Sequence, residues 1–296
     1  MELLKLWNIE GQEVHEIQKE VWLIDQTYIL KAYDNEAECR KNLMIYDSLR
    51  HYDIPIPELI PTKQGEAFAT ANQVFYLLTR RLSGNHLTKE EVFASPELAY
   101  KIGKTVGRLH RAFADITGQI EVTDNNFIHE MKGWIKRNLQ EHATDSFTYG
   151  IIDACTEELA AVYDQLERHL IHRDMHLGNL LFEGKELTGY IDFDLSQINA
   201  RIFDIAYLCA GWAVGQVGDA AYMGSWKQAL QVILSGYQEE QPLSVTERNS
   251  LGIMMCCIEI LFVAYFSSSK DTANSAKAEE CLRWLWENRK SHTEKE

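Results

Sequence analysis

The chain has 296 residues, of which 46% are hydrophobic, and its formal net charge is −15. This length supplies enough apolar material for one large domain or two lobes with a buried core. The acidity excludes an ordinary nucleic-acid binder, which needs a basic stripe to neutralise phosphates. It fits a soluble protein and, more weakly, favours cationic ligands.

The cysteine pattern and the N-terminus indicate the compartment. The six cysteines form no C-x-x-C pair, so we expect buried free thiols rather than a metal cluster or a disulfide framework. The N-terminus carries acidic residues and lacks a long apolar core, which argues against a signal peptide. The most apolar stretch, Ile253–Phe266, is too short to span a bilayer and contains Glu259. We therefore predict a cytoplasmic protein with no membrane partner, and the oligomeric state stays open.

Strand-like runs dominate the N-terminal part of the chain. Alternating or β-branched residues predict strands at Val14–Gln18, Val21–Asp25, Thr27–Tyr33 and Val74–Leu82. A helical pattern covers Glu36–Arg50. Pro55 and Pro57 then force an extended segment, because each lacks an amide donor and restricts the residue before it.

Helical periodicity dominates from Gly84 onward. The predicted helices are Glu97–Phe113, Asn126–Leu139, Ile151–His169, Ile205–Val214, Tyr222–Tyr237, Val245–Phe266 and Ala273–Arg289. The order is therefore a small β-rich lobe, a linker and a large helical lobe. This order predicts an α+β fold.

The segment Leu170–Phe193 carries the most specific chemistry. It places His172, Asp174 and Asn179 in the pattern H-x-D-x-x-x-x-N. After a predicted turn, a strand-like run ends at Asp192. A phosphoryl-transfer site needs these parts in this order: a carboxylate that positions and deprotonates the acceptor, then an amide and a second carboxylate that hold Mg²⁺.

Three motifs resemble the aminoglycoside phosphotransferase and choline kinase superfamily, a branch of the protein-kinase-like fold. They stand at His172–Asn179 (HRDMHLGN), Ile191–Phe193 (IDF) and Asp204–Ala206 (DIA). His176 is typical of the small-molecule kinases, because protein kinases usually have a lysine there. The interval from Asp192 to Asp204 leaves little room for an activation segment, so a protein kinase is disfavoured.

The resemblance implies a role for each residue of the motif. Asp174 would be the catalytic base, and Asn179 and Asp192 would coordinate Mg²⁺. Asp194 either adds charge near the metal or is a solvated turn residue. His172 is expected to be structural.

Two further residues of these motifs are expected to support the catalytic loop. Asp204 would accept hydrogen bonds from backbone amides of the loop, which burial would otherwise leave without a partner. Arg173 would pair with a neighbouring carboxylate.

The resemblance also implies a nucleotide site. Lys31 would contact the α- and β-phosphates of ATP, and GTP is not excluded. The other implied contacts are apolar walls for the base and two backbone groups of the hinge: Ile29, Leu181, Ile191, the Arg80 carbonyl and the Leu82 amide.

The chain departs from the family pattern at two places. The turn over the phosphates, Gln18–Glu20, contains no glycine. Asn42 stands where a helix glutamate usually pairs with the strand lysine. Glu36 and Glu38 lie nearby in the sequence, but an ordinary solvated role is favoured for both.

The implied fold is a two-lobed protein-kinase-like fold. Its small antiparallel sheet forms a nucleotide-binding lobe at residues 1–79, followed by a hinge at 80–84. The mainly helical lobe at 85–296 carries the catalytic loop and the acceptor site. Trp134, Trp212 and Tyr207 are candidate acceptor contacts, although core or surface roles are favoured for each.

The predicted function is an ATP- and Mg²⁺-dependent transfer of a phosphoryl group to a hydroxyl of a small molecule. The acidity mildly favours an amine-bearing acceptor, such as an amino sugar or amino alcohol. The alternative is a kinase-fold binding protein with little or no turnover, like some spore-coat-associated proteins. The two departures support this alternative, and the intact set of Asp174, Asn179 and Asp192 opposes it.

Overall fold

The computed structural model describes residues 2–142 and 146–290. Contacts within the chain divide it into two compact units. The first, unit 1, comprises Met1–His86, Gly118–Val122 and Gly178–Asp194, and the second, unit 2, comprises Leu87–Thr117, Thr123–Leu177 and Leu195–Glu296. A β-sheet in unit 1 and a mainly helical unit 2 confirm the predicted α+β class. The lobe boundaries predicted at residues 79 and 85 stay predictions.

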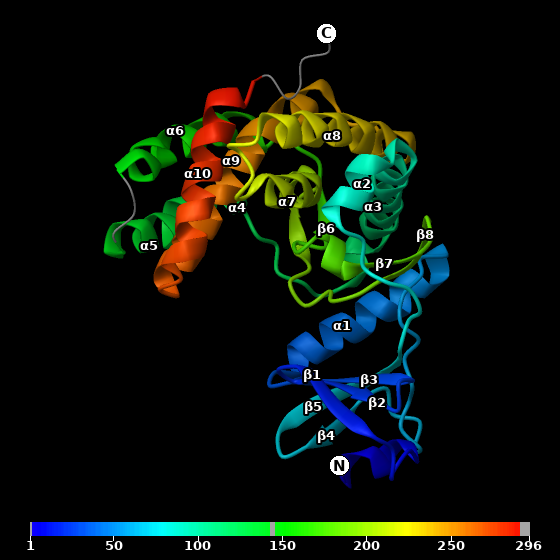
Figure 1. Cartoon of the computed structure of the whole chain (residues 1–296). Helices are drawn as coiled ribbons and strands as arrows, with labels where there is room; N and C mark the ends of the chain where they lie inside the picture. Colours follow the sequence, from blue (N-terminus) through cyan, green and yellow to red (C-terminus); the bar gives the residue numbers. More distant parts are fainter. Residues whose placement is uncertain (1, 143–145, 291–296) are drawn as a thin grey trace. The chain divides into compact units, whose positions relative to one another are not determined.

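Unit 1 is built on a five-stranded sheet in the order β1-β2-β3-β5-β4, and every neighbouring pair is antiparallel (Figure 1). The strands are β1 (Val14–Gln18), β2 (Val21–Ile24), β3 (Tyr28–Tyr33), β4 (Ala69–Ala71) and β5 (Val74–Arg80). All four predicted strands are confirmed. Strand β4 was not predicted, because three residues are too few to show an alternating pattern.

The two faces of this sheet have different partners, because successive strand residues point to opposite sides. Leu30 and Leu78 pack on one face with Leu4 and Trp7 of a 3₁₀ helix, η1 (Glu2–Trp7). On the other face, a second cluster joins Tyr33 of β3 and Leu77 of β5 to Cys39 of helix α1 (Glu36–Leu49). The residues of β3 and β5 that share the α1 face therefore line the space where the site is found.

Unit 1 also contains a late hairpin of β7 (Leu180–Glu183) and β8 (Glu186–Tyr190). It follows a 3₁₀ turn, η5 (Leu177–Asn179). Reciprocal backbone hydrogen bonds of 2.9 Å tie Asn85 to Phe182 in β7. The predicted turn between the two strands is confirmed, and β8 leads directly to Asp192.

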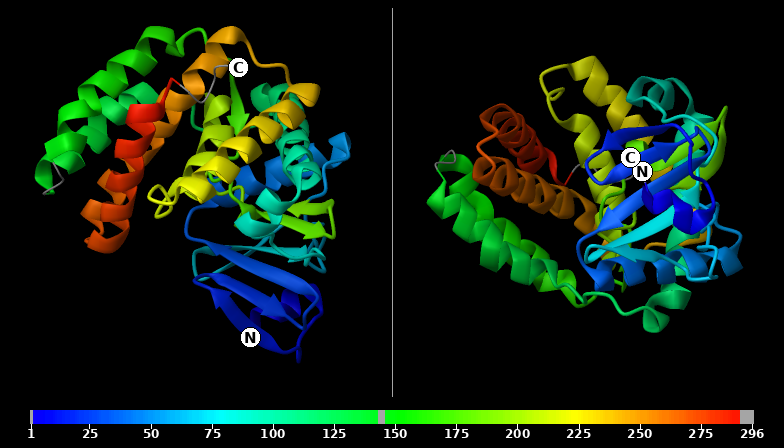
Figure 2. Two further views of the ribbon diagram at one scale, coloured as in Figure 1. Left: turned by 45° about the horizontal axis from the view of Figure 1, so that its top comes forward. Right: turned by 90° about the horizontal axis from the view of Figure 1, so that it is seen from below.

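Unit 2 is mainly helical. Its helices are α2 (Lys89–Ala94), α3 (Pro96–Ile116), α4 (Phe127–Glu130), α5 (Lys136–Glu141), α6 (Ser146–Tyr163), α7 (Ile202–Ala213), α8 (Ala220–Glu240), α9 (Val245–Ser268) and α10 (Thr272–Asn288). Helix α9 packs against α6, α7 and α10, and Figure 2 shows α9 and α10 as an adjacent pair.

Two of the predicted helices are wrong in extent. Helix α6 ends at Tyr163, and Arg168–Ile171 forms strand β6, which pairs with β9 (Gln197–Ala200). The prediction therefore extended the helix past its end and over Arg168 and His169, the first half of β6. The predicted helix Asn126–Leu139 is interrupted by a π-helical turn, where Gly133 leaves helical geometry. Glycine permits this break because it has no Cβ.

The length argument against a membrane span is also wrong. Helix α9 has 24 residues, and its most apolar 18-residue window has a mean hydropathy of 1.9, enough to cross a bilayer by length and composition. Within the structure, however, 78% of its most apolar window is buried. A helix that is apolar all round is what the centre of a large core requires. The expected buried, free state of all six cysteines is confirmed.

Candidate active site

A cavity of about 390 Å³ lies in unit 1, on the α1 face of the sheet. Ile29, Lys31 and Tyr33 alternate along β3 and line it, as do Leu77 and Thr79 of β5. The hairpin β7–β8 contributes to the same cavity. Its further lining residues are Ile17, Gln18, Val21, Tyr46, Pro57, Arg80, Arg81, Leu82, Gly84, Asn85, His86, Leu181, Ile191 and Asp192.

The predicted nucleotide-base residues therefore line a single cavity. Its apolar lining includes Ile29, Leu181 and Ile191. Gly189 of β8 leaves room for the Leu82 side chain, because a Cβ at this glycine would lie 2.2 Å from Leu82 Cδ1. Sequence reasoning missed Gly189, whose pattern signal is no different from that of other glycines.

The backbone amide of Leu82, which was predicted to bind the nucleotide base, is available as a hydrogen-bond donor. The amides of Arg80 and Arg81 donate to Glu58 O and Thr27 O, each at 2.8 Å. The Leu82 amide, in contrast, donates no hydrogen bond within the described residues. A buried or half-buried amide needs a partner, which water or a ligand can supply.

Lys31 forms ion pairs with two carboxylates of one segment. Its Nζ lies 2.7 Å from Asp192 Oδ1 and 2.6 Å from Asp194 Oδ2. Burial lowers the pKa of Lys31, but the two carboxylates outweigh burial and raise it overall. The expectation that the helix glutamates would not hold Lys31 agrees with the described contacts, in which Glu36 pairs with Arg40.

The turn between β1 and β2 is free of glycine, as the sequence indicates. Glu20 takes the left-handed conformation there, with φ of 64°. Non-glycine residues in this region carry some strain. Ile17 and Gln18 of this hairpin line the cavity, so side chains of β1 contribute to its wall.

Asp174 lies in unit 2, where it is held by two neighbours. Its Oδ1 accepts a hydrogen bond of 2.6 Å from Tyr207 Oη of α7, and its Oδ2 lies 3.4 Å from His176 Nε2. Burial raises the pKa of Asp174, but the hydrogen bonds of His176 and Tyr207 lower it to about 2. The carboxylate is therefore ionised at neutral pH. Tyr207 was named as an acceptor contact, and its direct bond to Asp174 was missed.

The loop that carries Asp174 is fixed by Asp204 of α7. Asp204 accepts hydrogen bonds of 2.8 Å from the amides of His172 and Arg173, and His110 Nε2 of α3 lies 3.0 Å away. Arg173 has a φ of 74°, so the residue before Asp174 is held in the left-handed region. The expectation that Asp204 serves as an internal acceptor for this loop is confirmed.

Arg173 anchors the same loop through its side chain. Its Nη2 lies 3.0 Å from Glu130 Oε2, and its guanidinium lies 4.4 Å from the ring centre of Phe203. The expected pairing of Arg173 with a carboxylate is confirmed.

Trp134 Nε1 donates to Glu130 at 3.4 Å, whereas Trp212 is buried. These two tryptophans therefore support packing and the loop.

The two predicted metal ligands lie in unit 1. The backbone oxygen of Asn179 accepts from the amide of Ile191 at 3.1 Å, which brings Asn179 beside the residue before Asp192. Asp192 takes the left-handed conformation with φ of 64°. Amide and carboxylate oxygens suit a hard divalent cation, and nucleotide phosphates and water commonly complete such a site. No cluster of three or more His, Cys, Asp or Glu side chains suited to a metal occurs in the described residues.

The family can now be assigned. Residues 15–243 match the model of the phosphotransferase enzyme family, APH. The chain belongs to this family. It is a small-molecule kinase with a kinase-like fold, as the sequence predicted.

Two relatives are homoserine kinases. That of Agrobacterium fabrum (strain C58 / ATCC 33970) is 26% identical over 241 residues, which cover 78% of this chain and 69% of that protein. That of Zymomonas mobilis subsp. mobilis (strain ATCC 31821 / ZM4 / CP4) is 22% identical over 239 residues, covering 78% and 70%.

Solved structures show the same fold. A microcompartment-associated aminopropanol kinase gives a TM-score of 0.77 at 15% identity, covering 99% of this chain and 97% of its own. An amicoumacin kinase in complex with AMP-PNP, Ca²⁺ and Ami gives 0.71 at 15% identity, covering 99% and 92%. A GDP complex of an aminoglycoside 2′-phosphotransferase gives 0.67 at 14% identity, covering 97% and 96%.

Proposed function

We propose that this protein transfers the γ-phosphoryl group of ATP to a hydroxyl of a small, amine-bearing alcohol, with Asp174 as the catalytic base. The observation that carries the proposal is the state of Asp174. Its carboxylate is oriented by Tyr207 and His176, and its pKa is about 2. A carboxylate held in this way, on a loop fixed by Asp204, is suited to receive a hydroxyl group.

The cavity of unit 1 supports ATP as the donor. Ile29, Leu181 and Ile191 offer apolar surfaces to a base, and the Leu82 amide is available as a donor. Lys31 lies on the same wall and would contact the α- and β-phosphates. Related structures contain AMP-PNP or GDP, which is consistent with a nucleotide donor.

Asn179 and Asp192 would hold Mg²⁺. When bound, the ion neutralises charge on the β- and γ-phosphates. The oxygen chemistry of both side chains fits this ion, and the ion pair between Asp192 and Lys31 supports a cation at this carboxylate.

Asp174 contributes mainly by orienting the acceptor. Its pKa of about 2 makes it a weak base towards an alcohol, so the proton moves to it late, as the new oxygen–phosphorus bond forms. This agrees with a loose transition state, in which the nucleophile needs alignment more than early deprotonation.

Amino alcohols are the acceptor class that the comparisons favour. Homoserine, aminopropanol and aminoglycosides, named for the similar proteins, each combine an amine with a hydroxyl. The net charge of −15 agrees with a cationic acceptor. We also assign the protein to the cytoplasm, where ATP and reduced thiols coexist.

A panel of acceptors tests this proposal. Phosphate-ester formation would be followed by ³¹P NMR with homoserine, aminopropanol, an aminoglycoside and the matched alcohol propanol, which lacks the amine. We expect ATP-dependent product with at least one amine-bearing acceptor, and a loss of about 10²- to 10⁴-fold in kcat for Asp174→Asn. Nucleotide binding without transfer to any acceptor would instead support the non-catalytic binding protein.

A further inference from the structure

Lys31 has two carboxylate partners, and the proposed function leaves only one of them to hold it in place. In this structure the ammonium lies between Asp192 and Asp194. If Asp192 holds the metal, as the proposed function requires, its carboxylate is engaged by a stronger cation. Asp194 is then the carboxylate that remains for Lys31.

Asp194 is itself held in place from β3 and α1. Its Oδ2 lies 2.6 Å from Lys31 Nζ, and its Oδ1 accepts a long hydrogen bond of 3.5 Å from Tyr33 Oη. Lys41 Nζ of α1 donates to the backbone oxygen of Asp194. Phe193, the preceding residue, packs edge-on against Tyr46 of α1 with 5.7 Å between ring centres. The segment that carries both carboxylates is thus fixed to the small sheet and its helix.

Helix α1 has Asn42 at the position where the resemblance implies a glutamate, and the neighbouring Lys41 is the cation that reaches Asp194. Asn42 is fully buried, its Nδ2 donates to Glu38 O at 3.1 Å, and its Oδ1 has no partner within the described residues. No ion pair joins Lys31 to a carboxylate of α1 in the described part of the chain. Lys41 of α1 therefore binds the backbone oxygen of Asp194, and the side-chain carboxylate of Asp194 binds Lys31.

We propose that Asp194 is the positioning residue for Lys31, in place of a helix glutamate. The inference rests on the proposed function, because it assigns Lys31 to the nucleotide phosphates. Asp194 acts through Lys31 and needs no contact with nucleotide or metal. The asparagine at position 42, in place of a helix glutamate, is then no sign of an inactive protein.

Metal-free nucleotide binding separates this role from metal coordination. ADP affinity would be measured by calorimetry in EDTA and again in excess Mg²⁺, for the wild type, Asp194→Asn, Asp194→Glu and Lys31→Met. We expect Asp194→Asn to weaken ADP binding about threefold to tenfold in both buffers, with recovery in Asp194→Glu. In the Lys31→Met background, Asp194→Asn should produce no further weakening.

Three results would overturn the inference. A loss confined to the Mg²⁺ buffer would make Asp194 a metal ligand. An equal loss in the Lys31→Met background would show that Asp194 acts independently of Lys31. Tighter binding by Asp194→Asn would show that the carboxylate competes with phosphate for Lys31. Glu38→Gln is the matched control, because it removes an exposed carboxylate of α1 that has no ion pair with Lys31.

A second readout needs no nucleotide. If the wild type binds no ADP in either buffer, the proposed function fails, and the anchoring of Lys31 is decided by amine acylation and mass spectrometry. Lys31 should be labelled about twofold faster or more in Asp194→Asn than in the wild type. Lys136, paired with Asp153, serves as the reference. Unchanged labelling of Lys31 would refute the anchor.

Discussion

At the scale of single residues, the ionised state of Asp174 depends on His176 and Tyr207, and only His176 belongs to the motif that contains Asp174. His176 belongs to the loop, but Tyr207 comes from α7. The Tyr207 ring is itself held by stacking on Phe203 and by contact with Phe262. Its hydroxyl is therefore aimed at Asp174 by packing, and this arrangement can be tested by removing one oxygen atom.

Tyr207→Phe should lower kcat by about tenfold to hundredfold with a small effect on KM, because hydrogen bonds to charged groups contribute roughly 1.5–3 kcal/mol. The pKa of Asp174, held at about 2 by His176 and Tyr207, should rise. Activity requires the ionised form, so the acid limb of the pH–rate profile should move to higher pH. The exposed Tyr265 provides the matched control, Tyr265→Phe. An unchanged profile in Tyr207→Phe would refute this role.

Sequence reasoning at this scale succeeds where spacing along the chain carries the chemistry. Asp174, Asn179 and Asp192 fall within the single segment Leu170–Phe193, and the acceptor role of Asp204 followed from a motif as well. Tyr207 and Lys41 reach their partners from distant helices. Nothing in the local pattern distinguishes such residues from ordinary core or surface side chains.

At the scale of elements, α3 and α8 approach so closely that only glycine fits at their contact. A Cβ on Gly103 would lie 1.9 Å from Ile233 O, and a Cβ on Gly236 would lie 2.0 Å from Tyr100 O. Because the nearest atoms are backbone, a side chain cannot be accommodated without separating the helices. This contact matters for the site, since α3 carries the His110 that bonds to Asp204.

Gly236→Ala should therefore destabilise the protein by about 1–3 kcal/mol or more, through overpacking. Gly224 lies on the same helix with open space around it, so Gly224→Ala should be neutral or stabilise by about 0.5–1 kcal/mol. Urea unfolding of both variants measures the difference. Equal stabilities would contradict the close approach of the two helices.

Helix α9 contains a buried carboxylate that should make stability depend on pH. Both oxygens of Glu259 lack a hydrogen-bond partner within the described residues, and burial raises the pKa of Glu259 to about 8. Between the ordinary pKa of 4.5 and about 8, the unfolded chain loses this proton while the folded protein keeps it. Folding stability should therefore fall as pH rises through this window.

Glu259→Gln should remove this loss, because the amide cannot ionise. The variant should gain stability over the wild type on the order of a few kcal/mol between pH 5 and pH 8. Urea unfolding at several pH values measures this gain. Parallel pH curves for the two proteins would show that Glu259 is already ionised or solvated in the folded state.

Long, periodic elements were predicted well, and short or buried ones poorly. Helices α3, α7, α8, α9 and α10 lie where the periodicity places them. The first two residues of strand β6, Arg168 and His169, were read as the end of a helix, because a four-residue strand is too short to show an alternating pattern. The membrane argument considered only the apolar stretch Ile253–Phe266, whereas the helix that carries it runs over Val245–Ser268.

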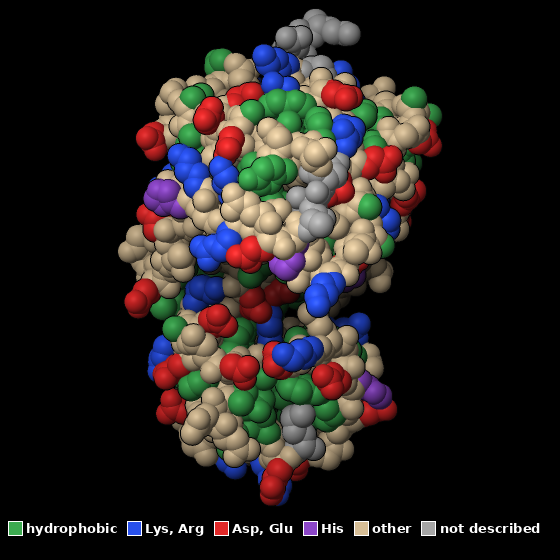
Figure 3. Space-filling model, turned by 90° about the vertical axis from the view of Figure 1, so that its left-hand side faces the viewer, with side chains coloured by type: hydrophobic (Ala, Val, Ile, Leu, Met, Phe, Trp, Pro, Cys, Tyr) green, Lys and Arg blue, Asp and Glu red, His purple; other side chains and the backbone are tan. Residues whose placement is uncertain are grey.

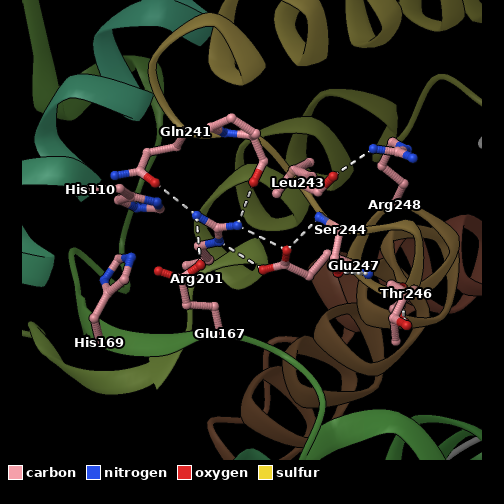
Figure 4. A network of polar contacts seen from close by, with 12 residues as sticks. His110, Glu167, His169, Arg201, Gln241, Leu243, Ser244, Thr246, Glu247 and Arg248 are labelled. Atoms are coloured by element: carbon pink, nitrogen blue, oxygen red, sulfur yellow. Dashed lines mark hydrogen bonds and ion pairs between the residues drawn. The ribbon is translucent and has the colours of Figure 1, made fainter.

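At the scale of the whole molecule, a buried ionic network joins the connections of unit 2 (Figure 4). Arg201 pairs with Glu247 through two hydrogen bonds of 2.7 and 2.9 Å, and it also donates to Gln241 Oε1 and Pro242 O. It lies just before α7, which presents Asp204 to the catalytic loop. The network therefore fixes the start of α7 to the connection between α8 and α9.

Glu247→Gln should destabilise the protein by about 3–5 kcal/mol, because Arg201 would remain buried without its main counter-ion. Burial raises the pKa of Glu247, but Arg201 and Ser244 lower it overall. The contribution of Glu247 to folding stability is complete above its ordinary pKa of 4.5 and is lost as pH falls below it.

The matched control is Asp153→Asn, which breaks the exposed pair with Lys136. It should change stability by less than about 0.5 kcal/mol. Comparable losses in the two variants would contradict this account.

The distribution of surface charges agrees with the exclusion of a nucleic-acid binder, which needs a basic stripe. Acidic and basic side chains are interspersed over the face drawn in Figure 3, rather than gathered by sign. The net charge of −15 thus excluded a nucleic-acid binder but could not identify the acceptor. An acceptor is recognised by the shape and chemistry of a site, which overall charge does not encode.

The most direct test of the kinase assignment is the melting temperature with and without MgATP, for the wild type, Asp174→Asn and Asp192→Asn. Ligand at about 100 times its Kd should stabilise the protein by roughly 2.7 kcal/mol. This corresponds to about 2–4 °C for each kcal/mol in a chain of this size. We predict a rise for the wild type and for Asp174→Asn, and its loss in Asp192→Asn. No rise in the wild type, or an equal rise in Asp192→Asn, would contradict the nucleotide site described here.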